Sequence, residues 1–269
     1  MFSPLKKLMP SIKELKKICL DPQDINNPKS IIQEKIPRIF SIRITKLLLY
    51  TPITANHITL IMIFWGFITA FLFSTGSYWY MLAGAIVLEF LIILDCIDGE
   101  LARYKKIFSL NGIFLDLVAH VTNVAVPFIG LTLGLYKLYP SNYIILAGFS
   151  ASVFSILCLD IQALKHHVVI REIIKYANKI EQTTSKKIHK NTAKISKKNI
   201  LKSISQGINW LYQGLNIIQV FLLGAIFNKL HWVLFFYGLT FPLMWLIKLI
   251  HEYRVGYKPY EYLFEPYKK

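Results

Sequence analysis

Paired cysteines are missing from this sequence. Its three cysteines, Cys19, Cys96 and Cys158, lie far apart and share no recognisable spacing, which argues against a disulfide framework and against a zinc site. The sequence also has no Walker-type phosphate loop, no repeat of the inverted-transporter kind and no small-residue cleavage site after a short apolar core near its start. We therefore expect neither a P-loop NTPase, nor an inverted-repeat transporter, nor a cleaved signal peptide.

Acidic residues are scarce, and apolar residues are abundant. Asp and Glu number 15 against 31 Lys and Arg, hydrophobic residues make up 54% of the 269 positions, and the mean hydropathy is +0.45. The apolar residues gather in runs long enough to cross a bilayer, which takes about 20 residues each. We predict an all-α integral membrane protein with six transmembrane helices, at residues 57–76, 79–101, 111–136, 142–164, 208–229 and 231–251.

The positive charge is unevenly distributed. Residues 1–50 contain ten Lys or Arg, and residues 165–206 contain eleven against two acids, whereas the connections near 77, 138 and 230 carry almost no charge. Cytoplasmic loops retain positive charge, so six spans with both termini in the cytoplasm account for every basic segment. Because the membrane surface explains these basic runs, we expect no nucleic-acid partner.

Two segments outside the spans have helical patterns of their own. Residues 1–30 resemble an arm, and apolar positions between 32 and 47 follow helical spacing, which predicts an amphipathic helix at the membrane interface or a connector helix packed on protein. The basic segment 165–206 could bind anionic lipid headgroups or be a solvated loop. The predicted divisions are an arm and interfacial helix at 1–50, a catalytic membrane domain at 51–255 and a cytoplasmic tail at 256–269.

The most informative segment is DCIDGELARYKKIFSLNGIFLDLVAH, residues 95–120. Asp95 and Asp98 are three residues apart, and Asp116 and His120 are four apart, so each pair lies on one face of its own helix. A carboxylate facing lipid is costly, and intramembrane acids usually mark a functional site. The pattern predicts a polar pocket between two helices near the cytoplasmic surface.

Clustered carboxylates could bind divalent cations, relay protons or form a structural ion pair such as Asp98 with Arg103. Charge balance favours cations, because three acids near one point repel one another unless a cation or a proton lies between them. Magnesium in particular is usually held by a few carboxylates together with substrate phosphates. Gly99, Ala102 and Gly112 allow either a ligand or another helix to approach the backbone closely. Glu100 is expected to face the headgroups.

The spacing D-x2-D-G-x2-A-R-x8-G-x3-D-x3-H resembles the signature of the CDP-alcohol phosphotransferase family, which has a fourth aspartate where this chain has His120. The resemblance extends over about residues 35–255 and implies that two divalent cations, Mg²⁺ or Mn²⁺, bind to the acidic positions. The implied metal ligands are Asp95, Asp98, Asp116 and His120. The implied contacts of the CDP moiety are Asn56, Thr59, Gly99, Ala102, Arg103 and Gly112.

The same resemblance implies an enzyme of phospholipid or related polar-lipid biosynthesis. Such an enzyme transfers a substituted phosphate from a CDP-alcohol, for example CDP-diacylglycerol, to an acceptor hydroxyl and releases CMP. His120 is then the expected general base, since histidine accepts protons near neutral pH, and it could also ligate a metal. Two alternatives stay open: a soluble CDP-aminoalcohol or CDP-polyol as the donor, and a non-catalytic protein that binds nucleotide or cation.

The sequence does not identify the acceptor. Lys105, Lys106 and Arg171 could hold an acceptor phosphate, and they equally serve the topology. Membrane lipids are expected partners, and the family resemblance allows a homodimer. The predicted location is a cytoplasmic or inner membrane, with the active site facing the cytoplasm.

Overall fold

The structure, a computed structural model, describes residues 10–19, 36–107, 109–181 and 214–255 of the chain. The regular elements in these ranges are all helices, so the predicted all-α fold class is confirmed. They are α1 (Ile12–Cys19), α3 (Ile36–Leu48), α4 (Ala55–Ser74), α5 (Tyr78–Lys105), α6 (Leu110–Leu138), α7 (Asn142–Glu181), α9 (Gly214–Ile226) and α10 (Leu230–Val255).

Within the described residues, five helices contain a stretch long and apolar enough to cross a membrane: Ala55–Ser74, Tyr78–Lys105, Leu110–Leu138, Asn142–Ile161 and Leu230–Arg254. Each begins within two residues of the predicted start of a span, because the hydrocarbon thickness fixes the length of the apolar run. The remaining predicted span, 208–229, corresponds to the short apolar helix α9. Its first six residues, 208–213, lie outside the described residues.

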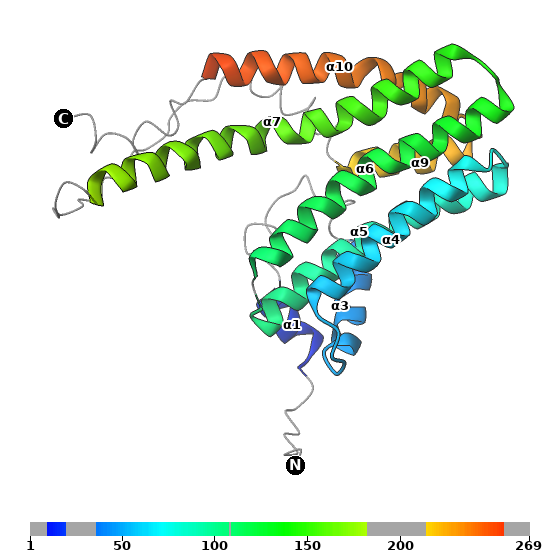
Figure 1. The fold of residues 1–269 in the computed structure, drawn as a ribbon. Coiled ribbons are helices and arrows are strands. Elements are labelled where there is room, and N and C mark those ends of the chain that lie inside the picture. The colour runs from blue at the N-terminus through cyan, green and yellow to red at the C-terminus, as the bar shows by residue number, and fades with distance from the viewer. Residues whose placement is uncertain (1–9, 20–35, 108, 182–213, 256–269) are drawn as a thin grey trace, which may run out of the picture.

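The helices are arranged so that alternate connections meet at the same end (Figure 1). The short connections 75–77, 139–141 and 227–229 lie together at one end, whereas α1 and α3 lie at the opposite end of α4, α5 and α6. Helix α4 packs between α5 and α6, and α7 packs along α6 and α10. This up-and-down order agrees with the order of spans predicted from the sequence.

Close contact between α4 and α6 fixes the position of the site-bearing end of α6. A Cβ atom at Gly130 would lie 2.1 Å from the carbonyl oxygen of Ala70, and one at Gly134 would lie 2.0 Å from that of Phe73. No larger residue fits at these two positions, so the backbones approach closely, as is common between membrane helices. Helix α6 therefore begins beside the start of α4.

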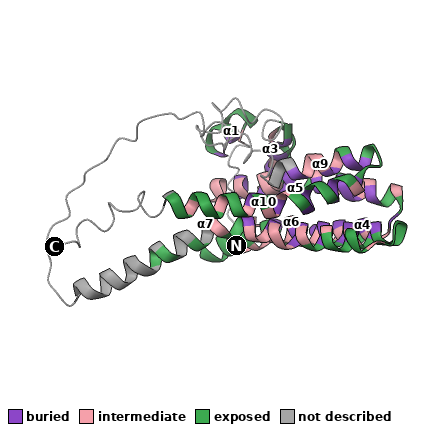
Figure 2. Cartoon of the chain, turned by 90° about the horizontal axis from the view of Figure 1, so that it is seen from above, coloured by how far each residue is buried: buried purple, intermediate pink, exposed green. Residues whose placement is uncertain are grey.

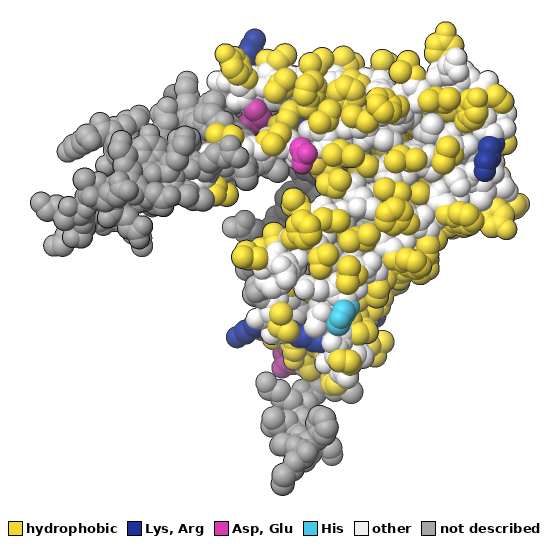
Figure 3. Space-filling view, viewed as in Figure 1, with side chains coloured by type: hydrophobic (Ala, Val, Ile, Leu, Met, Phe, Trp, Pro, Cys, Tyr) yellow, Lys and Arg dark blue, Asp and Glu magenta, His cyan; other side chains and the backbone are white. Residues whose placement is uncertain are grey.

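The interior of the bundle is aromatic, and its outside is apolar. Phe73, Phe128, Phe221, Tyr237 and Phe241 are buried and form a continuous set of ring contacts that joins α4, α6, α9 and α10. Buried residues lie between the helices and exposed ones along their outer sides (Figure 2). Hydrophobic side chains cover the outer face over α4, α6, α7 and α10 (Figure 3), as expected of a surface in contact with lipid.

Helix α3 is amphipathic, with its apolar stripe turned outward. Of the predicted stripe, Ile36, Ile39, Phe40 and Leu47 are all exposed, and Ile32 lies outside the described residues. An exposed apolar stripe on a short helix before the first span is the form expected of an interfacial helix. The opposite face of α3 packs on α5.

The contact between α3 and α5 contains a buried polar group, which corrects the expectation for Glu100. This carboxylate is fully buried instead of facing headgroups. Its Oε1 accepts a hydrogen bond from Ser41 Oγ at 2.7 Å, and its Oε2 accepts one from Thr45 Oγ1 at 2.7 Å. Because a buried carboxylate is costly unless it is hydrogen-bonded, these two hydroxyls fix the position of α3 on α5.

The short helix α1 packs on both α3 and α5. Its buried residues Leu15 and Cys19 contact Ile42 of α3 in a small separate apolar cluster. Part of the segment predicted to be an arm is therefore docked on the bundle. At the other end of the chain, α7 continues to Glu181, well past the predicted end of its span at residue 164.

Loss of the Glu100 carboxylate should loosen α3. In Glu100→Ala the hydroxyls of Ser41 and Thr45 lose their acceptor while buried, which costs about 1–3 kcal/mol for each group. Burial and the nearby Glu100 charge raise the pKa of the Cys19 thiol to about 11. Cys19 should therefore ionise more readily and react faster with a maleimide at pH 8 in the variant, as measured by mass spectrometry of its peptide.

Glu14→Gln is the matched control for this experiment, because Glu14 is an exposed acid on α1 whose carboxylate accepts a hydrogen bond from nearby Ser11. This control should leave the Cys19 labelling rate unchanged. An equal rate in wild type and Glu100→Ala would contradict the role given to Glu100.

Candidate active site

Three helix ends meet at the site, and local hydrogen bonds define each of them. Helix α4 begins after Thr54, whose backbone N–H donates to His57 Nδ1 at 3.2 Å. Helix α6 begins after Ser109, whose Oγ accepts the backbone N–H of Gly112 at 3.0 Å. Such capping satisfies backbone donors that the first helical turn leaves unpaired.

The end of α5 is attached to the start of α4 by a lysine. Lys105 Nζ donates hydrogen bonds to the carbonyl oxygens of Thr51 at 3.2 Å and Ile53 at 2.6 Å. The chain then turns at Lys106, which has a φ of 53°. Lys105 therefore holds the loop before α4 in place, a structural role that was not among the two predicted for it, acceptor binding and membrane topology.

A cavity of about 390 Å³ opens between these helix ends. All ten residues predicted from the sequence as metal-, nucleotide- or proton-binding line it: Asn56, Thr59, Asp95, Asp98, Gly99, Ala102, Arg103, Gly112, Asp116 and His120. They come from α4, α5 and α6. The structure thus brings together residues that are up to 64 positions apart in the sequence, from 56 to 120.

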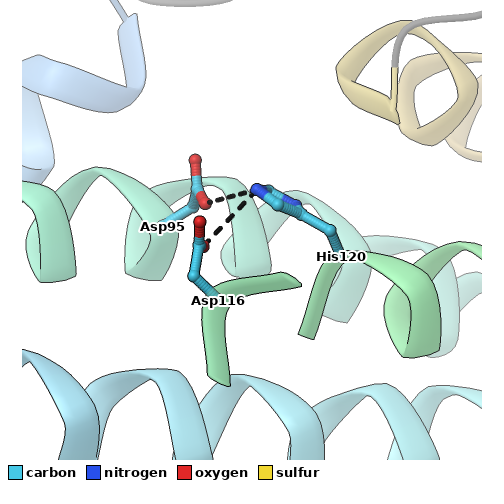
Figure 4. A group of neighbouring side chains, drawn as sticks. All are labelled: Asp95, Asp116 and His120. Carbon is cyan, nitrogen blue, oxygen red and sulfur yellow. Dashed lines mark ion pairs between the residues drawn. The ribbon is translucent and has the colours of Figure 1, made fainter. Parts of the chain in front are cut away.

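Two carboxylates and one imidazole form the tightest group in this cavity (Figure 4). Asp95 projects from α5, and Asp116 and His120 project from α6. The Nε2 atom of His120 lies 3.5 Å from Asp116 Oδ1 and 3.7 Å from Asp95 Oδ1. The side chains are 54%, 45% and 33% exposed for His120, Asp116 and Asp95, so the group is open to ligands.

Asp98 lies apart from this group but in the same cavity. Its Oδ2 accepts a hydrogen bond from Thr59 Oγ1 at 2.9 Å, which connects α5 to α4. Asp98 also interacts electrostatically with Asp95 and Asp116. Among the described residues no ion pair joins it to Arg103, so the alternative of a structural Asp98–Arg103 pair has no support.

The side chain of Arg103 is held in place by α1, a helix outside the membrane spans. Its Nε donates to the backbone carbonyl of Cys19, the last residue of α1. Its guanidinium lies along Gly99, where a Cβ atom would be 3.2 Å from Nη2. The carbonyl at a helix C-terminus is a favourable partner for a cation.

Asn56 and Gly112 face each other across the cavity wall. A Cβ atom at Gly112 would lie 2.9 Å from Asn56 Oδ1 and 3.2 Å from Ser109 Oγ. Any residue other than glycine would displace either the Asn56 amide or the helix cap. The start of α6 therefore depends on glycine at this position.

The donor set fits a divalent cation. Asp95, Asp116 and His120 each offer one ligand atom, and these atoms all lie within 4.8 Å of one another. Ligands on opposite sides of a magnesium ion are about 4.2 Å apart, twice the usual bond length, so small side-chain movements suffice. Carboxylate oxygens suit magnesium and manganese, and the softer imidazole shifts the preference toward manganese.

Six further residues line the cavity, and among them Arg38 and Ser109 carry polar groups suited to binding a ligand. Ser109 could have been found, because a serine three residues before Gly112 and directly before an apolar helix is typical of an N-cap. Arg38 belongs to α3, which was predicted to lie at the membrane interface or to pack on protein as a connector, without any part in the site.

These features define a helical membrane protein with an acidic, metal-competent cavity at the ends of three helices. Residues 52–193 match the family described as CDP-alcohol phosphatidyltransferase, and the chain belongs to this family. Its members transfer phosphate-linked groups from a CDP-alcohol and use divalent cations. None of the curated proteins matches the chain by sequence.

Replacement of Gly112 by alanine should weaken nucleotide binding. The added methyl group would press on Asn56 Oδ1 and Ser109 Oγ, and such overpacking typically costs about 1 kcal/mol or more, or roughly five-fold in affinity. Calorimetric titration of the purified chain with CMP measures the effect.

Gly84→Ala is the control, because a methyl there would lie 3.0 Å from the ring of Phe73 in the helix packing and away from the cavity. It should lower the unfolding temperature and leave CMP affinity unchanged. Wild-type affinity in Gly112→Ala would argue against nucleotide binding beside Asn56.

Proposed function

We propose that this protein is a metal-dependent transferase of polar-lipid synthesis. It moves a substituted phosphate from a CDP-alcohol, such as CDP-diacylglycerol, to an acceptor hydroxyl and releases CMP. The single observation that carries the proposal is the position of Asp95, Asp116 and His120 in one cavity with the predicted nucleotide contacts.

Asp95, Asp98 and Asp116 are the proposed cation ligands, and His120 is either the fourth ligand or, with its Nε2 free of metal, the general base. Bound divalent cations would neutralise the negative charge of the diphosphate and the charge that develops on the phosphate of the departing CMP. Asn56, Thr59, Gly99, Ala102, Arg103 and Gly112 are the proposed contacts of the CDP moiety. The starts of α4 and α6 contribute Ala55, Ser109 and Gly112 to the cavity, and a helix N-terminus favours phosphate.

His120 is the proposed general base. Its Nε2 takes the proton of the acceptor hydroxyl, the acceptor oxygen bonds to the phosphorus that carries the non-nucleotide alcohol, and the bond from that phosphorus to the CMP oxygen breaks. The resulting imidazolium would lie 3.5 and 3.7 Å from the carboxylates of Asp116 and Asp95, which would stabilise its positive charge.

We also propose that the cavity opens toward the cytoplasm. The cavity end of the bundle carries Arg38, Arg103, Lys105 and Lys106, whereas the connection 75–77 at the other end has no charged residue. This asymmetry follows the positive-inside rule, and cytidine nucleotides are available on that side. The proposed catalytic domain, 51–255, then works together with α3, since Arg38 lines the same cavity.

Release of CMP tests the function. The purified chain in detergent, given CDP-diacylglycerol and a panel of hydroxyl acceptors, should release CMP only with Mg²⁺ or Mn²⁺ and only with a suitable acceptor. Asp116→Asn should lower the rate at least about 100-fold, since loss of metal-based stabilisation costs several kcal/mol.

Asp160→Asn is the matched control, because Asp160 is an exposed acid on α7 and does not line the cavity. It should keep the wild-type rate. CMP release from a CDP-aminoalcohol instead would select the soluble-donor alternative, and metal-dependent CDP binding without any release would select the non-catalytic one.

Substitution of His120 separates its two possible roles. If His120 is the base, His120→Ala should lose turnover by about 100-fold or more and keep metal-dependent CDP binding, as measured by calorimetry. His120→Asp restores the fourth aspartate of the family signature and should retain turnover. A wild-type rate in His120→Ala would show that the base is another group, and loss of CDP binding would show that His120 is mainly a metal ligand.

A further inference from the structure

The inner face of α3 has a polar pattern of its own. Arg38, Ser41 and Thr45 are spaced i, i+3 and i+7, so they lie on one side of the helix. Ser41 and Thr45 hold the buried Glu100 carboxylate of α5 through two hydrogen bonds of 2.7 Å. These bonds set the rotation of α3 about its axis, and that rotation turns Arg38 inward.

Arg38 reaches the cavity of the candidate active site. Its side chain lines this cavity, and its Nε and Nη1 atoms are buried. Arg38 and Arg103 both interact electrostatically with Asp95 and with Glu100. The guanidinium groups of Arg103, from α5, and of Arg38, from the helix before the first span, therefore both lie close to these carboxylates.

Membrane contact does not explain an arginine in this position. A basic side chain on an interfacial helix normally extends to the headgroups, and Arg43 on the outer face of α3 is exposed in this way. Burial of a cationic group is costly unless it has anionic partners, and Asp95 and Glu100 offset part of this cost for Arg38. The planar guanidinium matches phosphate oxygens in pairs, and phosphates are what the proposed reaction brings into the cavity.

We propose that Arg38 is a substrate-binding residue, which α3 brings into the cavity to hold a phosphate group of the donor or of the acceptor beside Arg103. This inference rests on the proposed function. It makes α3 part of the active site, so the cavity lacks one phosphate ligand whenever α3 is not seated on Glu100.

Binding measurements on the full chain test the proposal without relying on turnover. Calorimetric titrations with cytidine, CMP, CDP and inorganic phosphate, in the presence of Mn²⁺, compare wild type with Arg38→Ala, Arg38→Lys and Arg43→Ala. Loss of a charge-assisted phosphate contact should weaken CDP binding by about ten-fold or more in Arg38→Ala and leave cytidine binding within about two-fold.

The matched control is Arg43→Ala, which removes the same side chain from the exposed face of the same helix and should bind every ligand as wild type does. Arg38→Lys keeps the charge without the paired geometry and should bind CDP with intermediate affinity. The unfolding temperature in detergent shows whether Arg38→Ala folds. If it does not, the affinities of Arg38→Lys are compared with wild type instead.

The pattern of losses identifies the phosphate. Weaker CDP binding identifies the donor diphosphate, and weaker inorganic phosphate binding in the CMP-saturated protein, with CDP binding unchanged, identifies an acceptor phosphate. Equal losses for cytidine and CDP would show that Arg38 only shapes the cavity, and wild-type affinity for all four ligands would also overturn the inference. If wild type binds CDP but releases no CMP from any donor, the proposed function fails and this inference does not.

Discussion

Buried carboxylates are the constraint on which this structure depends. An acid near the hydrocarbon region is tolerated only where another polar group meets it, and one stretch of α5 carries three. Asp95 faces Asp116 and His120 on α6, Asp98 accepts a hydrogen bond from Thr59 on α4, and Glu100 accepts two from α3. Asp95 and Asp98 lie on one side of α5 and line the cavity, whereas Glu100 lies on another side and meets α3. Contacts of α5 therefore help to place three neighbouring helices, and the cavity is the space between their ends.

Much of this arrangement was predictable from local spacing. The apolar runs gave the spans to within a few residues at their starts, since bilayer thickness fixes their length. The i, i+4 spacing of Asp116 and His120 predicted that both lie on one face of a helix. In the structure they lie together with Asp95 in the group that could bind a cation. The family resemblance supplied the rest of the candidate residues, and all ten line one cavity. What each of them does chemically stays a prediction until it is tested.

The features that could not be predicted depend on contacts between distant segments. Glu100 bonds to residues 59 and 55 positions earlier, and no local pattern indicates which helix a buried acid will meet. Arg103 donates a hydrogen bond to the backbone carbonyl of Cys19, 84 positions away. Every residue has such a carbonyl, so the residue type does not indicate which one an arginine will bond. The extent of α7 was missed for another reason. Hydropathy indicates where a helix leaves the membrane, whereas backbone hydrogen bonding lets the helix continue beyond that point, here to Glu181.

The mixture of charges in the cavity has a thermodynamic consequence. Asp95, Asp98 and Asp116 repel one another, and Arg38 and Arg103 each offset part of the charge on Asp95. A diphosphate alone would be attracted by the arginines and repelled by the aspartates. A cation alone would be attracted by the aspartates and repelled by the arginines. When both bind, the cation neutralises the aspartates that repel the diphosphate, and the diphosphate neutralises the arginines that repel the cation. Each ligand must therefore raise the affinity of the site for the other by the same factor. On the proposed function, this coupling lets the site hold a nucleotide firmly only in the presence of the metal that the reaction needs.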